Sequence, residues 1–200
     1  MSSEEAWLTR EALESLGFAS LGRDVKVSRL ASIHKASAIS LGNHVRIDDF
    51  CVLTGGEGIV IGERVHLGCF CALLGGAGIE MEAFSTLSSR VNVFSESDDY
   101  SGGSMTNPTV PDKYRSTERG RVTIGRHAIV GAASTLLPGV RLGEGVAVGA
   151  HTLVNKDCEP WWVYVGVPAR KLRARSRALL ELEHELLEDA HNAGPLKRRD

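Results

Sequence analysis

A repeat of twenty and then of eighteen residues constrains the fold of this chain more than any other feature. Aliphatic side chains return every six residues, and every third one begins a new turn of the repeat. In the first block they form three series at a spacing of twenty: Leu21, Leu41, Ile61 and Met81; Val27, Ile47, Leu67 and Leu87; Ile33, Leu53, Leu73 and Val93. In the second block they run Ile124, Val130, Leu136, Leu142, Val148 and Val154. Neither the helical period of 3.6 nor the strand period of 2 fits this spacing.

Small or β-branched residues stand two positions before these aliphatics, for example Cys51 and Cys71. One large and one small inward residue on each of three short strands per turn predict a triangular prism, in which like residues stack into continuous columns. The twenty-residue turns need a two-residue bulge, and the glycines in residues 55–58 and 75–78 supply the backbone freedom for it. A phosphate-binding loop is the alternative explanation of these glycines, but its third glycine and its helix are missing.

The segments outside the hexads predict short appendages to one solenoid. We expect a capping helix in residues 1–20, the β-helix in residues 21–173 and a helix with a frayed tail in residues 174–200. Ser2 and Glu5 form a possible capping box, and Trp7 and Leu13 belong to the apolar face of the N-terminal helix. The leucines of the C-terminal helix recur at helical spacing and predict packing against this prism or a neighbour's. A long loop inserted at about 95–120 carries adjacent carboxylates, aromatics and amides, which favours a functional role.

Composition excludes several classes of function. The formal charge of −2 gives no electrostatic support for nucleic acid as a partner. No apolar run is long enough for a signal peptide or a membrane span, so we expect no membrane insertion and a cytoplasmic location. Cys69 and Cys71 with His66 could form part of a metal site, but no second pair completes four ligands and Cys71 falls in a core column. We therefore expect no metal.

The run from Val122 to Leu172, with Asn155, Lys156 and Asp157 followed by the GVPAR segment, resembles the hexapeptide-repeat acyltransferases. It is most similar to the sugar O-acetyltransferases that act on galactosides and maltose. The resemblance implies a left-handed parallel β-helix, a homotrimer, and acetyl-CoA as co-substrate in a cleft between neighbouring prisms.

Several residues match family positions that bind the coenzyme. Ala132 and Ala150 are eighteen residues apart and would lie one above the other, where small side chains let the pantetheine arm reach the backbone. Lys156, Arg170 and Arg173 match positions near the nucleotide, and cationic groups suit its phosphates. A solvated basic face leading into the last helix is the alternative explanation of the arginines.

The chain departs from the family at the catalytic histidine. Ungapped alignment puts Asp98 at that position, and alignment from the far end of the loop gives Asn107. Asp98 or Asp99 could act as the general base if burial raised its pKa, and His66, which points outward, is the third candidate. Tyr100, Asn107 and Tyr114 are candidates for contacts with the acceptor.

The predicted function is acetyl transfer from acetyl-CoA to a hydroxyl or amino group of a sugar or nucleotide-linked sugar, in the synthesis of surface-polysaccharide precursors. A hydroxyl acceptor is slightly preferred, although loss of the histidine favours an amine, which needs less help from the protein. Two rivals remain open. A metal enzyme like the γ-class carbonic anhydrases needs three converging histidines, which the repeat does not supply, and a non-enzymatic scaffold would not need Lys156 and the GVPAR segment.

Overall fold

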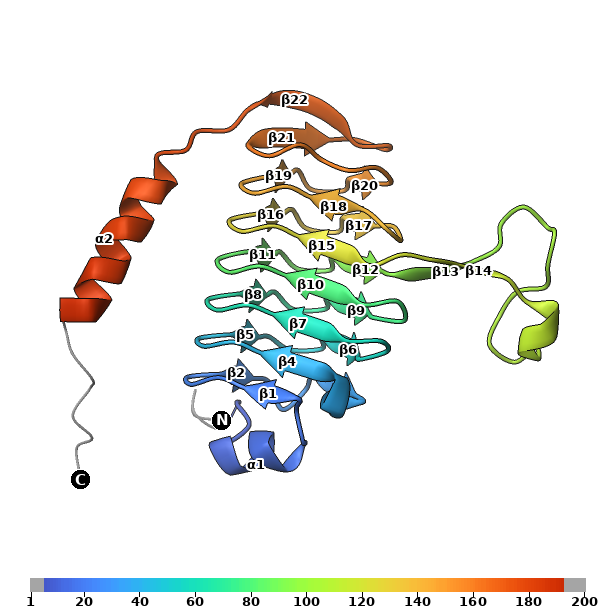
Figure 1. The fold of residues 1–200 in the computed structure, drawn as a ribbon, viewed down its shortest axis with the longest axis horizontal. Coiled ribbons are helices and arrows are strands. Elements are labelled where there is room, and N and C mark those ends of the chain that lie inside the picture. Colours follow the sequence, from blue (N-terminus) through green and yellow to red (C-terminus); the bar gives the residue numbers. More distant parts are fainter. Residues whose placement is uncertain (1–5, 193–200) are drawn as a thin grey trace.

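The computed structural model describes residues 6–192, which form a three-sided parallel β-helix with an arm and two terminal helices (Figure 1). The first sheet contains β1 (Ser20–Leu21), β4 (Ile39–Leu41), β7 (Ile59–Ile61), β10 (Ile79–Met81), β15 (Val122–Ile124) and β18 (Arg141–Leu142). The second contains β2 (Lys26–Val27), β5 (Arg46–Ile47), β8 (His66–Leu67), β11 (Thr86–Leu87), β16 (Ile129–Val130), β19 (Ala147–Val148), β21 (Trp162–Val165) and β22 (Arg170–Ala174). The third contains β3 (Ser32–His34), β6 (Val52–Thr54), β9 (Ala72–Leu74), β12 (Asn92–Phe94), β17 (Thr135–Leu136) and β20 (Leu153–Val154).

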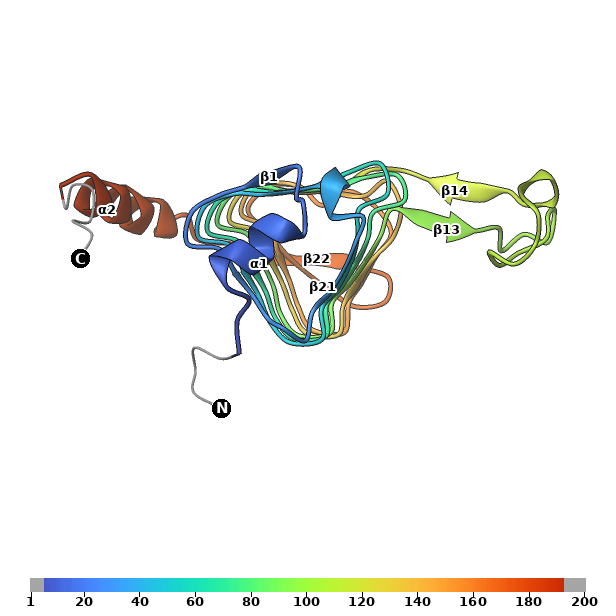
Figure 2. The ribbon, with the colours of Figure 1, turned by 90° about the horizontal axis from the view of Figure 1, so that it is seen from below.

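The coils stack in register and wind with a left hand. Equivalent residues pair along each sheet, as Leu67 does with Leu87 and Leu87 with Val130. Seen from the N-terminal end, the chain runs anticlockwise through the three sides of the triangle while moving away from the viewer (Figure 2). The predicted left-handed parallel β-helix is therefore confirmed.

The hexad residues form the core. The aliphatics of the two blocks are buried except for Leu21 and Ile33 of the first coil, which are partly exposed at the open end. Glycine is needed where coils approach closely at a corner, since a Cβ on Gly42 would lie 2.6 Å from the carbonyl carbon of Gly62 in the next coil. Repetition of this contact keeps the coils close enough to share one ladder of hydrogen bonds.

At each corner of the triangle, a turn carries the chain from one sheet to the next, and the three turns differ in conformation. We name them by the sheets they join: the first–second, the second–third and the third–first corner. The extra residues of the twenty-residue coils lie at the third–first corner, where Gly56 has a φ of +49° and Gly58 a φ of +134°. The two extra residues of the coil therefore lie at the glycines, as predicted.

The N-terminal helix α1 (Arg10–Ser15) lies across the open end of the prism (Figure 2) and buries Leu13 in the core. It is shorter than predicted, since Thr9 caps it by accepting a hydrogen bond from the amide of Ala12. Trp7 precedes the helix in a β-bridge with Ser28, which corrects its placement on the helix. The proposed capping box of Ser2 and Glu5 lies outside the described residues.

The inserted segment, which the sequence predicted only as a long loop, has secondary structure of its own. Strands β13 (Glu96–Asp98) and β14 (Thr117–Arg119) pair antiparallel, and Asp112–Tyr114 form a 3-10 helix near the tip. We call the segment from 96 to 119 the arm. It leaves the prism at the third–first corner and projects away from it (Figures 1 and 2). Charge pairing supports it, since Arg119 Nε lies 3.3 Å from Glu96 Oε2.

The C-terminal helix α2 (Leu179–Asn192) stands beside the first–second corner (Figure 1). Glu183 links it to the prism by an ion pair with Arg126 and by a 2.7 Å hydrogen bond with Nε2 of His127. Its leucines are only partly used for packing, and Leu182 remains 64% exposed.

Candidate active site

Small residues form a column at the second–third corner. Following the register of β11, β16 and β19, Gly131 and Gly149 lie above Ser88, while Ala132 and Ala150 lie above Ser89. Glycine is required here because a Cβ on Gly131 would lie 2.5 Å from the amide nitrogen of Ala150. The structure thus brings Ala132 and Ala150 together on one corner, as predicted, and extends their column down to a pair of serines.

Backbone donors are available along this column. Within residues 6–192, the amide N–H groups of Ala132 and Ala150 have no hydrogen-bond acceptor. Unpaired N–H groups beside small side chains suit an extended chain that carries its own amide carbonyls. This is the local arrangement that the predicted contact with pantetheine requires.

The two serines below the alanines differ in what their hydroxyls touch. Ser89 Oγ lies 3.2 Å from the sulfur of Cys69 in the coil below. The hydroxyl of Ser88, by contrast, has no partner among the described residues. Ser88 therefore offers a free donor at the lower end of the column. The sequence analysis missed this residue, because the arm interrupts the spacing and hides its place beneath Gly131.

The predicted cations gather at the upper end of the prism but not at one point. Arg170 begins β22 opposite Val165, directly after the turn that leads from the second–third corner, and Arg173 lies further along the strand opposite Val163. Lys156 lies at the third–first corner, between β20 and the bridge formed by Cys158. All three are exposed, and none has an ion-pair partner in the described part of the chain.

The two candidate carboxylates of the arm have different surroundings. Asp98 ends β13, accepts a hydrogen bond from the amide of Asn107 at 3.2 Å, and lies 3.9 Å from a guanidinium nitrogen of Arg115. Asp99 accepts hydrogen bonds from Ser101 and Ser104, and these lower its pKa to about 2, those from Ser101 contributing most. Asp99 is therefore a weak proton acceptor at neutral pH, because a useful base has a pKa near the working pH.

The predicted acceptor contacts lie further out on the arm. Tyr100 is 95% exposed, whereas Tyr114 is half exposed with the ammonium of Lys113 over its ring. Asn107 has a φ of +70°, and its side chain accepts hydrogen bonds from the amide and hydroxyl of Thr109. Asn107 thus shapes the tip of the arm and orients Asp98 through its backbone.

His66 lies on the second sheet, one coil below Thr86. Its Nε2 is 2.8 Å from Asp48 Oδ2, and its Nδ1 is 3.5 Å from the hydroxyl of Thr86. Burial alone would raise the pKa of Asp48, but the hydrogen bonds and charges of His66 and Arg46 outweigh it and lower this pKa. The pair has the arrangement of an oriented histidine, with its ring still partly exposed.

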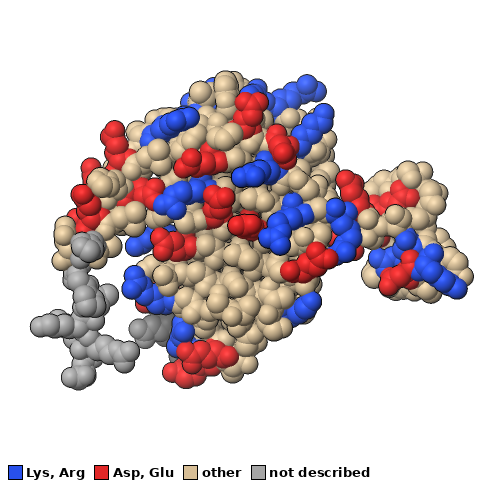
Figure 3. Space-filling model, viewed as in Figure 1, with Lys and Arg blue, Asp and Glu red and all other residues tan. Residues whose placement is uncertain are grey.

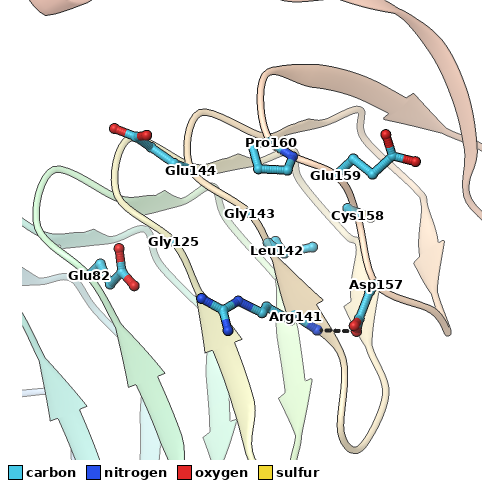
Figure 4. A pocket seen from close by; sticks show the side chains of 10 residues that line it. All are labelled: Glu82, Gly125, Arg141, Leu142, Gly143, Glu144, Asp157, Cys158, Glu159 and Pro160. Carbon is cyan, nitrogen blue, oxygen red and sulfur yellow. Dashed lines mark hydrogen bonds between the residues drawn. The ribbon is translucent and has the colours of Figure 1, made fainter.

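Figure 4 shows a pocket on the first sheet that has the wrong charge for a phosphate. Glu82, Glu144, Asp157 and Glu159 line it, and Arg141 is the one basic residue among its lining residues. The Arg141 amide already donates to Asp157 at 2.8 Å. On the face drawn in Figure 3, basic and acidic side chains are interspersed, and no large patch of one sign is seen there.

Metal ligands do not gather in the described residues. Between residues 6 and 192 no group of three or more His, Cys, Asp or Glu side chains could hold a metal ion. Cys71 lies in the core and Cys69 contacts Ser89, so the two cysteines point to different surroundings. Over the same residues, no helix is long and apolar enough to cross a membrane.

The chain is similar over most of its length to characterised sugar-nucleotide acyltransferases, although no protein-family model matches it. It is 44% identical over 179 residues to a dTDP-4-amino-4,6-dideoxy-D-glucose acyltransferase of Escherichia coli, a match that covers 89% of this chain and 93% of the relative. The structure of AntD, an N-acyltransferase from Bacillus cereus in complex with dTDP and 3-hydroxybutyryl-CoA, superposes with a TM-score of 0.90 at 44% identity, covering 93% of this chain and 98% of AntD.

The solved structures of AntD include variants at a serine and at an aspartate. These two residues are ten apart in the AntD chain. A maltose O-acetyltransferase from Clostridium difficile gives a TM-score of 0.56 at 20% identity, over 84% of this chain and 74% of that one, which shows a common fold only. The left-handed β-helix, its column of small residues and the similarity to the Escherichia coli enzyme together establish that this chain is an acyltransferase and belongs to the family of hexapeptide-repeat sugar acyltransferases.

Proposed function

We propose that the protein transfers an acyl group from acyl-CoA to the amino group of a dTDP-linked 4-amino-4,6-dideoxy sugar. The observation that carries this proposal is the similarity, at 44% identity over nearly the whole chain, to an enzyme named for that acceptor. A solved AntD variant with dTDP-4-amino-4,6-dideoxyglucose and coenzyme A bound supports it further. On this basis we propose an amine as the acceptor, in place of the hydroxyl that the sequence analysis slightly preferred.

The column at the second–third corner supports a path for acyl-CoA. The pantetheine arm would run along Ala132 and Ala150, with its amides paired to their free N–H groups. The phosphates would lie near Arg170 and Arg173, because cations at the upper end of the prism offset their charge. The thioester would then reach the level of Ser88.

The reaction needs a nucleophile, a stabilised oxyanion and a leaving thiolate. The unprotonated amine attacks the thioester carbonyl carbon, forming a C–N bond, and the tetrahedral intermediate collapses with cleavage of the C–S bond. The amine loses one proton and the departing sulfur gains one, so protons balance overall. Ser88 Oγ would donate to the developing oxyanion, where a single placed donor is worth about 10²- to 10³-fold in rate.

Asp98 is the best supported of the three predicted catalytic groups. Its hydrogen bond from Asn107 and its distance from Arg115 leave the carboxylate less engaged than that of Asp99. It could orient the attacking amine and accept its proton. Ser88 and Asp98 are also ten residues apart, the same separation as the serine and aspartate replaced in AntD. Asp99 has the weaker case because its pKa is low, and His66 remains a candidate base.

We further propose that the working assembly is a homotrimer. Ser88 lies at the second–third corner and Asp98 on the arm at the third–first corner, so a site that uses both groups requires two subunits. Closed three-fold symmetry would supply such a site three times. The exposed acceptor candidates Tyr100 and Tyr114 would then face the neighbouring prism rather than solvent.

The cellular role follows from the acceptor. Acylated amino sugars on nucleotide carriers are donors for glycan assembly, so we place the reaction in the cytoplasm, in the synthesis of surface-polysaccharide precursors. The acyl group is left open to acetyl and short hydroxyacyl chains, since AntD was solved with 3-hydroxybutyryl-CoA.

The decisive experiment is an acceptor comparison. Purified protein is incubated with acetyl-CoA or 3-hydroxybutyryl-CoA and dTDP-4-amino-4,6-dideoxyglucose, and product is identified by mass. The matched control is the same nucleotide sugar with a hydroxyl at C4. We expect turnover of the amine alone. Equal or greater turnover of the hydroxyl sugar would overturn the proposal.

A further inference from the structure

An exposed pair of phenylalanines lies at the second–third corner below Ser88. Phe50 and Phe70 occupy the same turn position in successive coils and stack with ring centroids 4.9 Å apart and an interplanar angle of 19°. They are 48% and 47% exposed, so almost half of each side chain faces solvent. We call Phe50, Phe70 and the neighbouring Arg90 the aromatic ledge.

The turn itself does not explain the aromatic residues. Phe50 and Phe70 have φ values of +60° and +63°, in the left-handed region that bulky side chains avoid. In the coils above, Ala133 adopts the same conformation, with a φ of +59°. Glycine or asparagine would form this corner at lower cost. Two bulky rings held in an unfavourable conformation and left half exposed point to a binding role.

A cation completes the ledge. Arg90 takes the equivalent turn position one coil above Phe70, and its guanidinium carbon lies 5.5 Å from the Phe70 ring centroid. Within residues 6–192 it has no ion-pair partner. Two stacked aromatic faces beside an unpaired guanidinium suit a ligand that joins a flat ring to phosphate, because the ring can stack and the phosphate can pair with the cation.

The ledge also lies on the correct side of the site. Arg90 follows Ser88 by two residues in the same turn, and Phe70 and Phe50 lie one and two coils below. Acyl-CoA on the proposed path would approach Ser88 from above, along Ala132 and Ala150. The acceptor must therefore approach from the coils below, which carry the ledge.

From this geometry we infer that Phe50, Phe70 and Arg90 bind the nucleotide part of the acceptor, the pyrimidine ring stacking on the phenylalanines and the diphosphate pairing with Arg90. The inference rests on the proposed function and adds the subsite for the nucleotide carrier. The sugar amino group would then extend upward to Ser88. The acidic pocket of the first sheet cannot serve instead, since its four carboxylates repel a diphosphate.

The test uses dTDP binding by calorimetry together with steady-state kinetics. Phe70→Asn removes the ring but keeps a residue that tolerates positive φ, so the fold is retained. Loss of base stacking should raise the Kd for dTDP and the KM for the amino-sugar nucleotide by about 5- to 150-fold. The KM for acyl-CoA should stay within about twofold. Phe70→Tyr, which keeps an aromatic ring at this position, should bind dTDP with near wild-type affinity.

Leu30 provides a matched control. It occupies the same turn position one coil below Phe50 and is 52% exposed, but it lies further from Ser88. Leu30→Ala should leave dTDP binding unchanged.

Three results would overturn the inference. They are wild-type dTDP affinity in Phe70→Asn, a rise in the KM for acyl-CoA instead, and dissociation of the assembly by light scattering, which would mark the ledge as a subunit interface. If the unmodified protein fails to bind dTDP, both the proposed acceptor and the role of the aromatic ledge are wrong. If instead the unmodified protein binds dTDP and Phe70→Asn binds it equally well, only the role of the ledge is rejected.

Discussion

Ser88 and Asp98 are ten residues apart in the sequence but lie at different corners of the prism. The chain crosses the whole third sheet through β12 between them and then enters the arm. If both groups serve one reaction, we expect them to meet across a contact between two subunits. The separation therefore makes the subunit contact a testable part of the mechanism.

The first prediction is complementation between inactive variants. Ser88→Ala and Asp98→Asn should each have low activity alone. After unfolding, mixing in equal amounts and refolding, random trimers should regain about one quarter of wild-type activity, because one site in four then combines an intact serine with an intact neighbouring aspartate. Each variant refolded alone is the control. A mixture no more active than its components would place both groups in one subunit or remove one from catalysis.

The second prediction separates the two serines. Ser88→Ala should lower kcat by about 10²- to 10³-fold through loss of an oxyanion donor. Ser89→Ala should change kcat by less than about threefold, since the Ser89 hydroxyl already contacts Cys69. Single-turnover rates with saturating acyl-CoA measure the chemical step. Equal effects of the two substitutions would contradict the role assigned to Ser88.

The fold was predictable because its signal is repeated. Each inward aliphatic, such as Leu67, has equivalents in the coils above and below, so isolated exceptions do not obscure the period. The arm was predicted only as an interruption, because its two short strands follow no repeat and owe their pairing to contacts such as Glu96 with Arg119.

Of the candidate site, only the part that follows the repeat was predictable. The stacking of Ala132 on Ala150 could be predicted because eighteen residues return the chain to one corner. The place of Ser88 could not, because Gly131, which lies directly above it, follows 43 positions later, after the arm. The low pKa of Asp99 depends on hydrogen bonds from Ser101 and Ser104, and their geometry cannot be read from composition.

The third prediction concerns the pH dependence of the arm. Because folding lowers the pKa of Asp99 to about 2, its contribution to stability is present above the unfolded value of 3.8 and is lost as the pH falls through about 2. The Ser101 and Ser104 amides should lose protection from hydrogen exchange over that range. In Asp99→Asn their protection should be low and independent of pH. A pH-independent wild-type profile would show that the carboxylate does not hold the arm.

The fourth prediction distinguishes the cations. Arg170→Ala should raise the KM for acyl-CoA several-fold with little change in kcat, because contacts with the phosphates are equal in ground and transition states. Lys156 lies at a different corner, so Lys156→Ala should raise this KM only if the trimer brings it to a neighbour's coenzyme. Dephospho-CoA esters would show which phosphate is contacted. An unchanged KM in both variants would remove these residues from the coenzyme site.

The last prediction tests His66 against Asp98 as the base. If His66 accepts the proton, His66→Ala should lower kcat by about 10²-fold or more while coenzyme binding persists. Asp48→Asn should then lower kcat as well, because Asp48 holds the ring through the 2.8 Å contact with Nε2. If Asp98 serves instead, Asp98→Asn should cause the loss and His66→Ala should keep near wild-type kcat. A pH profile that follows the pKa of the acceptor amine in every variant would exclude both groups as the base, leaving Ser88 and the bound geometry to account for the rate.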